Sequence, residues 1–372
     1  MALYIGLMSG TSLDGVDGVI ADWAGARPRV LAHAHQPFGP PWRAELLALN
    51  GHGANELHRA ALAANEVARC YAQVVAWMLQ TSGLSAAAVT AIGAHGQTVR
   101  HRPLEFDGTG YTLQLLNGAL LAELTGIGTV CDLRSRDVAA GGQGAPLVPA
   151  FHAGLFGQPQ RDVAVLNLGG IANLTLLSAD GAVTGFDCGP GNALMDGWCE
   201  RHTGGAFDDG GRWAASGCTN PALLGSLLLE PFFAKAPPKS TGRDLLHLAW
   251  VEQALATRPG PAEALAPQDV QATLAELTAT CAATALRRHA PATTKVLVCG
   301  GGAFNGYLMG RLAALMPRVQ VCTTADEGVP PDQVEALAFA WLARAFVERQ
   351  PGNLPAVTGA RGRRVLGAWY PA

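Results

Sequence analysis

The sequence predicts an α/β protein of two domains, each with a mixed sheet and flanking helices around a cleft between them. Its 372 residues exceed the usual length of one domain. Apolar residues make up 49% and charged residues 15%, which is enough apolar material for two large cores. Apolar runs at residues 3–7 and 16–23 are joined by a turn of small residues, and the runs at 162–166 and 171–177 repeat this pattern. Two such hairpins half a chain apart indicate two domains built alike.

The other elements of the first domain follow from apolar spacing and from breaker residues. Residues 55–80 carry apolar side chains at helical spacing and end before Gly83, which predicts a long amphipathic helix. Short apolar runs predict strands at residues 29–38, 91–94, 111–116 and 129–133, and a short helix at 119–124. The run at 91–94 leads into His95, Gly96, Gln97 and Thr98.

A glycine-rich stretch at residues 134–149 is expected to be irregular and to mark the first domain boundary. We expect a first domain of residues 1–140 and about 345–372, and a second domain of residues 141–344. The glycines in residues 134–149 also suggest a hinge on which the domains close.

The second domain continues with strands at residues 183–186, 296–299 and 319–323 and with a helix at 193–203. An alanine-rich helix at 333–349 is expected to cross back to the first domain. The first of these strands leads directly into Asp187-Cys188-Gly189-Pro190-Gly191-Asn192. The second leads into Gly300-Gly301-Gly302-Ala303-Phe304-Asn305.

Composition excludes several classes of protein. The net charge of −3 leaves no basic surface for nucleic acid. None of the three lysines follows a glycine, so a Walker A phosphate loop is absent. Eight cysteines form no C-x-x-C pair, which argues against a disulfide framework or zinc site and favours a reducing compartment. With no signal peptide pattern and no apolar run of about 18 residues, we expect a cytoplasmic protein without a membrane partner.

The first hairpin turn is suited to bind a phosphate. Gly10, Thr11, Ser12, Leu13 and Asp14 join the two apolar runs, and Asp17 follows shortly after. Small residues and hydroxyls allow donors to approach an anion closely, and carboxylates suit an accompanying divalent metal. An ordinary polar turn held by Asx hydrogen bonds is the alternative.

Two hairpins with phosphate-sized turns and a strand ending in three glycines resemble the actin, sugar kinase and heat-shock chaperone superfamily, whose domains are RNase H-like. Five blocks in order resemble the anhydro-N-acetylmuramic acid kinase family more closely. They are Ser9 to Asp17, His95-Gly96-Gln97-Thr98, Gly141 to Pro149, Asn167-Leu168-Gly169-Gly170-Ile171-Ala172-Asn173 and Gly185 to Asn192. This chain departs from the family at Leu13, where Met is frequent, and at Cys188, where Thr is frequent.

The resemblance implies an ATP-dependent reaction on a small sugar. The 6-oxygen of 1,6-anhydro-N-acetylmuramic acid receives the phosphoryl group while water opens the anhydro ring. The product would be N-acetylmuramic acid 6-phosphate, an intermediate of peptidoglycan recycling. Because the substrate has no free 6-hydroxyl, the base must activate water. The family assigns that role to Asp187, for which capping of the next helix is the alternative.

The resemblance also implies contacts to ATP, to Mg²⁺ and to the sugar. Phosphate contacts are expected from Gly10, Thr11, Ser12, Leu13, Asp14, Gly15, Val16, Asp17, Gly169 and Gly170, and adenosine contacts from Gly300, Gly301, Gly302 and Asn305. Mg²⁺ would be held by the ATP phosphates, with Asp14 and Asp17 reaching it through water and with no direct protein ligand. Sugar contacts are expected from His95, Gln97, Arg134 and Glu335, although Arg136 or Arg100 would serve as well as Arg134 for the lactyl carboxylate. A homodimer is expected from the family.

Two other functions remain open at this point. One is an ordinary hexose or amino-sugar kinase of the same fold that acts on a hydroxyl. The other is a nucleotide-driven binding protein of the actin or chaperone type, which the absence of a long second module for a client disfavours. A metalloprotein of this superfamily would need a His-rich ligand motif, which the ten histidines do not form.

Overall fold

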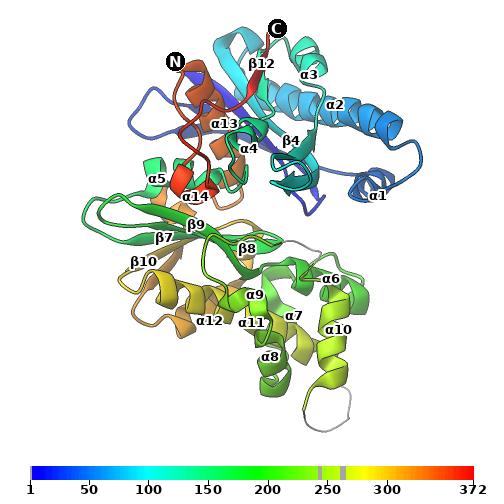
Figure 1. Cartoon of the computed structure of the whole chain (residues 1–372), viewed down its shortest axis with the longest axis vertical. Coiled ribbons are helices and arrows are strands. Elements are labelled where there is room, and N and C mark those ends of the chain that lie inside the picture. The colour runs from blue at the N-terminus through cyan, green and yellow to red at the C-terminus, as the bar shows by residue number, and fades with distance from the viewer. Residues whose placement is uncertain (1, 242–244, 260–264) are drawn as a thin grey trace. The chain divides into compact units, whose positions relative to one another are not determined.

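The computed structural model describes residues 2–241, 245–259 and 265–372, and it confirms an α/β fold (Figure 1). The chain forms two compact units, Met1–Phe151 with Gln333–Ala372, and His152–Asp332. Both divisions differ by about a dozen residues from the predicted boundaries at 140 and 344. Helix α13 (Val334–Val347) belongs wholly to the first unit, because it packs along strands β1 and β4 of that unit.

The first unit contains a sheet with strand order β12-β6-β4-β1-β2-β3, and β5 pairs with β4. Its strands are β1 (Leu3–Ser9), β2 (Gly15–Asp22), β3 (Arg29–Pro37), β4 (Val89–Pro103), β5 (Gly110–Leu115), β6 (Thr129–Cys131) and β12 (Ala368–Tyr370). Strands β1 and β2 are antiparallel with Met8 opposite Asp17, while β1 and β4 are parallel. The first predicted hairpin is therefore confirmed.

Strand β4 is far longer than the expected run at residues 91–94. Gln97 pairs with Ser9 of β1 on one side and with Leu115 of β5 on the other. Because both edges of this segment have partners, the strand continues through His95 and Gln97. The prediction that these two residues follow the strand is wrong, since they lie inside it.

Helices α2 (Glu56–Ser82) and α13 cover opposite faces of this sheet, and glycines let them approach (Figure 1). A Cβ on Gly18 would meet side chains of α2, whereas a Cβ on Gly6 would lie 1.8 Å from the carbonyl oxygen of Ala336 in α13. A side chain at either position would push the helix away from the sheet. The other helices of this unit are α1 (Pro40–Ala48), η1 (Ala86–Ala88), α3 (Gly118–Thr125), α4 (Ser135–Ala139) and α14 (Pro355–Thr358). Helix α5 (Val148–Phe156) spans the division between the units.

The second unit contains a sheet with strand order β11-β10-β7-β8-β9. Its strands are β7 (Val163–Leu168), β8 (Ile171–Leu177), β9 (Val183–Pro190), β10 (Lys295–Cys299) and β11 (Gln320–Thr323). Strands β7, β8 and β9 are antiparallel neighbours, while β10 and β11 run parallel to β7. In the first unit β1, β2, β3, β4 and β6 have the same order and directions. Both units therefore share one RNase H-like topology, as the repeated hairpin predicted.

The helices of the second unit surround α11 (Pro267–His289), most of whose side chains are buried in the core. The others are α6 (Ala193–Thr203), η2 (Asp209–Gly211), α7 (Arg212–Ala215), α8 (Pro221–Leu228), α9 (Pro231–Ala234), α10 (Leu248–Thr257), η3 (Gly301–Phe304), α12 (Gly306–Leu315) and η4 (Thr324–Glu327). Among the described residues of both units, no helix is long and apolar enough to cross a membrane.

Strand β9 is the edge of the second sheet and carries a bulge. Asp187 pairs with Asn173 and Gly189 pairs with Ala172, so Cys188 is the extra residue. The strand therefore continues past the expected end at residue 186. Asp187 lies within the strand, next to the bulge, and not beyond its end.

Candidate active site

The turn between β1 and β2, residues 10–14, is stabilised by one backbone hydrogen bond and by the buried side chain of Leu13. The Leu13 N–H donates to the carbonyl of Gly10 (3.3 Å), and Leu13 adopts a left-handed φ of 58° with its side chain buried in the core. Within 4 Å a Cβ on Gly10 would meet only atoms of Ser12. Thr11 and Asp14 are exposed. The turn thus presents small groups and a hydroxyl outward, as an anion site requires.

The next three predicted residues lie in β2 and differ in their surroundings. Gly15 lies against β3, where a Cβ would come 2.3 Å from a backbone oxygen, and Val16 is fully buried. The Asp17 carboxylate accepts a hydrogen bond from His35 Nδ1 (2.9 Å) and lies 3.6 Å from His33 Nε2. Burial raises the pKa of Asp17, but the neighbouring imidazoles of His33 and His35 outweigh burial and hold that pKa below its usual value.

His95 and Gln97 hold the same turn through its backbone. His95 Nδ1 donates to the carbonyl of Ser9 (3.1 Å), and Gln97 Nε2 donates to the carbonyl of Gly10 (3.0 Å). The Ser9 hydroxyl in turn bonds with the Tyr71 hydroxyl (2.8 Å). Burial, with the nearby charge of Arg134, lowers the pKa of His95 to about 3, so the ring is neutral. Its proton lies on Nδ1, and Nε2 is an acceptor.

Arg134 immediately precedes α4 and is fixed by three hydrogen bonds. Its Nε and Nη2 donate to His95 Nε2 (3.1 and 2.9 Å), and its Nη1 donates to the carbonyl of Gly144 (2.8 Å). Burial lowers the pKa of Arg134 to about 10, against the opposing charges of Glu335 and Asp137. The guanidinium therefore stays charged at neutral pH. Three of the four predicted sugar contacts, His95, Arg134 and Glu335, are neighbours in this unit.

Asp137 is a buried carboxylate that the sequence marked only as part of a loop. It accepts hydrogen bonds from the Gly144 N–H (2.8 Å), Asn353 Nδ2 (2.6 Å) and the Thr358 hydroxyl (2.8 Å). These donors satisfy the carboxylate and tie the glycine-rich segment to the C-terminal segment. The expectation that residues 134–149 are irregular is wrong in part, because α4 forms there around Asp137.

The β7–β8 turn, formed by Gly169 and Gly170, is bonded to the start of α6. The carbonyl of Gly169 accepts from the Asn192 N–H (2.7 Å), and the carbonyl of Gly170 accepts from the N–H groups of Gly191 (3.1 Å) and Ala193 (3.2 Å). A Cβ on Gly169 would meet no atom nearer than 3.8 Å. One side of this turn is therefore open.

Gly300, Gly301 and Gly302 directly follow β10, as predicted. Gly300 has a φ of 79°, and a Cβ there would lie 2.5 Å from Asn167 Oδ1. A Cβ on Gly302 would lie 2.5 Å from Leu168 Cβ, whereas Gly301 is exposed. Glycine at 300 and 302 lets the ends of β10 and β7 meet, and Gly301 presents bare backbone outward.

Asn305, predicted to contact the nucleotide, is the N-cap residue of α12. Its Oδ1 accepts from the Leu308 N–H (2.9 Å). A Cβ on Gly211, which has a φ of 74°, would lie 2.0 Å from the same oxygen. The side chain thus joins the beginning of α12 to η2, near the three glycines.

Asp187 is partly exposed on the edge strand of the second sheet. Its Oδ2 accepts from the Thr241 N–H (2.9 Å), and its own N–H donates to the carbonyl of Lys239 (3.1 Å). Burial raises the pKa of Asp187 to about 6, opposed by the Thr241 hydrogen bond and the charge of Lys239. The carboxylate is ionised at neutral pH and is a stronger base than an ordinary Asp. The N-cap position of α6 belongs to Asn192, so Asp187 does not cap that helix.

Cys188, where this chain departs from the family pattern, points into the core. Its Sγ donates to the carbonyl of Ala172 (3.4 Å) and is fully buried. Burial and the neighbouring Cys281 raise the pKa of this thiol well above its usual value. The substitution therefore changes the core beside β9 rather than the donors around the Asp187 carboxylate.

Sequence reasoning missed Lys239 and Thr241 as partners of Asp187. Both lie about fifty residues further along the chain, and no motif there marks them. Only the pairing of their segment with the edge of β9 brings them to the carboxylate.

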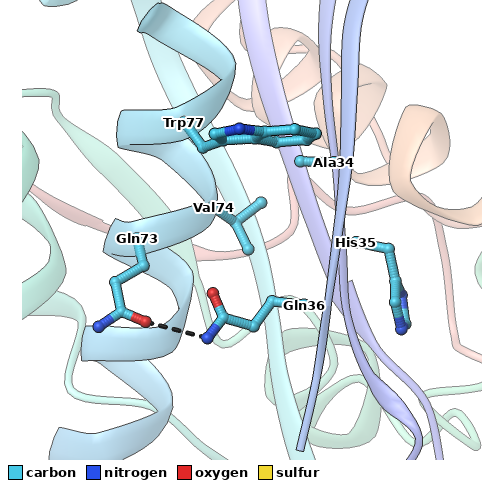
Figure 2. Close-up of a pocket in the computed structure, with 6 residues that line it drawn as sticks. All are labelled: Ala34, His35, Gln36, Gln73, Val74 and Trp77. Carbon is cyan, nitrogen blue, oxygen red and sulfur yellow. Dashed lines mark hydrogen bonds between the residues drawn. The ribbon is translucent and has the colours of Figure 1, made fainter. Parts of the chain in front are cut away.

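A separate pocket lies in the first unit between β3 and α2 (Figure 2). Figure 2 shows the Trp77 ring near Val74 and Ala34, with Gln36 Nε2 donating to Gln73 Oε1 (3.1 Å) below. None of the predicted site residues lines this pocket.

Comparison with known proteins identifies close relatives along the whole chain. A family model described as anhydro-N-acetylmuramic acid kinase matches residues 2–372. The anhydro-N-acetylmuramic acid kinase of Variovorax paradoxus is 61% identical over 375 residues, covering 100% of this chain and 99% of that protein. That of Bordetella petrii is 61% identical over 372 residues, covering 100% and 96%. That of Cupriavidus metallidurans is 58% identical over 372 residues, covering 99% and 97%.

Proposed function

The chain belongs to the anhydro-N-acetylmuramic acid kinase family, and from this premise we propose how its residues carry out the reaction of that family. The enzyme uses ATP to phosphorylate the 6-oxygen of 1,6-anhydro-N-acetylmuramic acid while water opens the anhydro ring. The product, N-acetylmuramic acid 6-phosphate, is an intermediate of peptidoglycan recycling.

Asp187 is the base in this proposal, and one observation supports that role above the others. Its carboxyl is partly exposed on a strand edge, and burial raises its pKa to about 6. A base of that pKa is mostly ionised at neutral pH and accepts a proton more readily than an ordinary Asp. Gly189 and Gly191 follow it and are buried: a Cβ on Gly189 would lie 2.7 Å from Cys281 Cβ, and one on Gly191 would lie 2.1 Å from the carbonyl oxygen of Gly169, so both fit the strand to the core.

The proposed reaction needs only one carboxylate, which acts as the base. The oxygen of water bonds to the anomeric carbon as its proton passes to Asp187. The bond from the anomeric carbon to O6 breaks, and O6 takes the γ-phosphoryl group while ADP leaves. Asp187 then returns its proton to solvent. The step is close to an inverting glycoside hydrolysis in which the phosphoryl group replaces the general acid.

We propose that ATP is held by residues of both units. In the first unit, the open face of Gly10 and the exposed Thr11 support a phosphate contact. Gly15 and Val16 shape that turn from within β2, since neither has an exposed side chain. In the second unit, the open side of Gly169 supports a second phosphate contact and the bare backbone of Gly301 supports the adenosine contact.

Mg²⁺ enters this proposal as the ion that accompanies ATP. When bound, Mg²⁺ neutralises charge on the transferring phosphates. Asp14 is exposed at the end of the phosphate turn and fits a role as acceptor for metal-bound water. Asp17 is already engaged by His35 and His33, so its water-mediated role stays a prediction. Among the residues that the structure describes, no group of three His, Cys, Asp or Glu side chains could hold a metal ion.

For the sugar we propose that Arg134 pairs with the lactyl carboxylate. Its charge and its fixed orientation against His95 support this role, because a guanidinium held in place binds a carboxylate with little loss of freedom. In this proposal His95 and Gln97 support the site from inside the fold, since both side chains are buried and are hydrogen-bonded to the backbone of the phosphate turn. Glu335 lies near Arg134 at the start of α13, partly exposed.

We further propose that the enzyme is a cytoplasmic homodimer. All eight cysteines are free, which suits a reducing compartment where ATP is available. Exposed apolar side chains such as Phe106 and Leu113 near the β4–β5 hairpin favour a second copy as partner. Cell fractionation tests the location and sedimentation velocity tests the dimer.

The decisive experiment is an assay with ATP, the anhydro sugar and ¹⁸O-water, followed by mass spectrometry of the product. A gain of one phosphoryl group plus one water, with ¹⁸O at the anomeric carbon, is expected. A product that gains only the phosphoryl group would instead identify an ordinary kinase acting on a hydroxyl.

A further inference from the structure

The segment after helix α9 is bonded to the strand edge that carries Asp187. Strand β9 is the last strand of its sheet, so one row of its backbone groups has no neighbouring strand. The Asp187 N–H donates to the carbonyl of Lys239, and the Thr241 N–H donates to the Asp187 carboxylate. Residues 239–241 therefore cover the edge and contact the base at the same time.

Lys239 ties this segment to α9. Its Nζ donates to the carbonyls of Phe232 (3.2 Å) and Phe233 (3.1 Å) at the end of that helix. The ammonium lies 4.8 Å from the centre of the Phe232 ring and 5.9 Å from that of Phe186, the residue before Asp187. Its carbonyl is engaged with β9 while its side chain is anchored to the helix.

We propose that Lys239 is a positioning residue for the base: it holds residues 239–241 on the edge of β9, so that the Thr241 N–H meets the carboxylate. Its ammonium also adds a positive charge near that carboxylate, which favours the ionised form. This inference rests on the proposed role of Asp187 in activating water. Lys239 acts through Asp187 and contacts no reacting atom in the proposal.

The other charged and titratable groups near this cluster lie on β9, on α11 and around α9, where Lys235 lies 6.0 Å from the Phe232 ring and the Glu230 carboxylate accepts from the Phe232 N–H (3.0 Å). Arg288 Nη1 donates to the carbonyl of Ala234 (3.1 Å), so it satisfies the same helix end without reaching β9. Burial, with the charges of Lys239 and Arg288, lowers the pKa of His289, whose ring lies 5.1 Å from that of Phe186. Burial raises the pKa of the thiols of Cys188 and Cys281. Both thiols are therefore neutral in the range where Asp187 titrates.

The experiment compares Lys239→Met with a matched control, Lys235→Met. Lys235 lies in the same segment and 6.0 Å from the same Phe232 ring, but its side chain is exposed. Both variants lose one charge, and only the first loses the anchor. Two readouts are taken on the full-length enzyme: the pKa of the Asp187 carboxyl by ¹³C NMR, assigned with Asp187→Asn, and the pH dependence of kcat.

In Lys239→Met we expect the Asp187 pKa to rise by about one unit, because the carboxylate loses a donor and a charge. The acid limb of kcat should move by the same amount, so kcat at pH 6.5 should fall about threefold while the KM for ATP stays unchanged. Lys239→Arg should restore most of the wild-type profile, and Lys235→Met should match wild type throughout.

Equal Asp187 pKa values in Lys239→Met and Lys235→Met would overturn the inference. A shifted NMR pKa with an unmoved kcat profile would leave the positioning role intact and reject Asp187 as the base. If circular dichroism shows that Lys239→Met is unfolded, Lys239→Gln, which keeps a donor to one carbonyl, is measured by the same criteria.

Discussion

Replacing Asp187 by Asn should abolish most turnover while making the second unit more stable at alkaline pH. Asn keeps the shape of the side chain, and its oxygen can still accept the Thr241 N–H. It cannot take a proton from water, so kcat should fall about 10²- to 10⁴-fold, the usual contribution of a general base. Affinity for ATP should not change, because no proposed ATP contact is altered.

The stability effect follows from the raised pKa of Asp187. The pKa rises from 3.8 to about 6 on folding, so the folded state binds the proton more tightly than the unfolded state. Stability therefore falls as pH rises from about 4 through 6, and at pH 8 the charged carboxylate costs about 3 kcal/mol, from 1.36 kcal/mol per unit. Partial exposure reduces this to about 1 to 2 kcal/mol. Asn removes that cost, which corresponds to a rise in Tm of roughly 2 to 8 °C for a unit of this size.

Calorimetry at pH 8 and pH 4, with ATP-dependent turnover of the anhydro sugar, tests both effects. Glu200→Gln provides the control, because Glu200 is an exposed acid on α6 and the substitution makes the same charge change. The stability gain should appear at pH 8 and disappear at pH 4, where Asp187 is protonated in the folded state. Turnover of Asp187→Asn within a few-fold of wild type, or lower stability than wild type at pH 8, would refute the reasoning.

Three further outcomes follow from the same contacts. The kcat of the wild-type enzyme should fall about tenfold per pH unit below about pH 6 as Asp187 becomes protonated; a stopped assay across pH 5 to 8 that shows a flat profile would contradict this. Gly93→Ala places a Cβ 2.0 Å from the carbonyl oxygen of Phe339 in α13 and should lower the free energy of unfolding of the first unit by about 1 to 3 kcal/mol. Urea titration measures this loss of stability, with Gly39→Ala as the control because its Cβ meets nothing within 4 Å. Equal urea midpoints for the two variants would count against the close contact between Gly93 and α13. Gly300→Ala forces a side chain onto a φ of 79° beside Asn167, so the KM for ATP should rise at least about tenfold, roughly 1.4 kcal/mol; an unchanged KM would remove Gly300 from the nucleotide site.

Local patterns were sufficient to predict the hairpins and the long helix α2, whereas α11 was not predicted. The alternation between apolar runs and small-residue turns at residues 10–14 and 169–170 depends only on neighbours in the chain, and both hairpins are confirmed. The spacing at residues 55–80 likewise predicted α2 within two residues at each end. Strand ends were less predictable. His95 and Asp187 were expected just beyond strands, and both lie inside them because strand length depends on partners on either side.

In the candidate site, too, local patterns were predictable from the sequence and tertiary contacts were not. Short blocks in the sequence indicated the phosphate turn, the three glycines and Asp187 as site residues, and their roles stay a prediction. The sequence could not show that Asp17 is engaged by His33 and His35, because that contact depends on the register of β2 against β3.

The sequence by itself determined the family, the repeated topology and the identity of the proposed base, since each is written in local composition and in the order of the blocks. Only the tertiary structure decided the properties of that base. Burial raises the Asp187 pKa, Thr241 donates to its carboxylate and Lys239 anchors the segment that brings Thr241 there. The contact between Thr241 and Asp187 joins positions more than fifty residues apart, and the energies of all these contacts depend on distance and desolvation, which no linear pattern specifies.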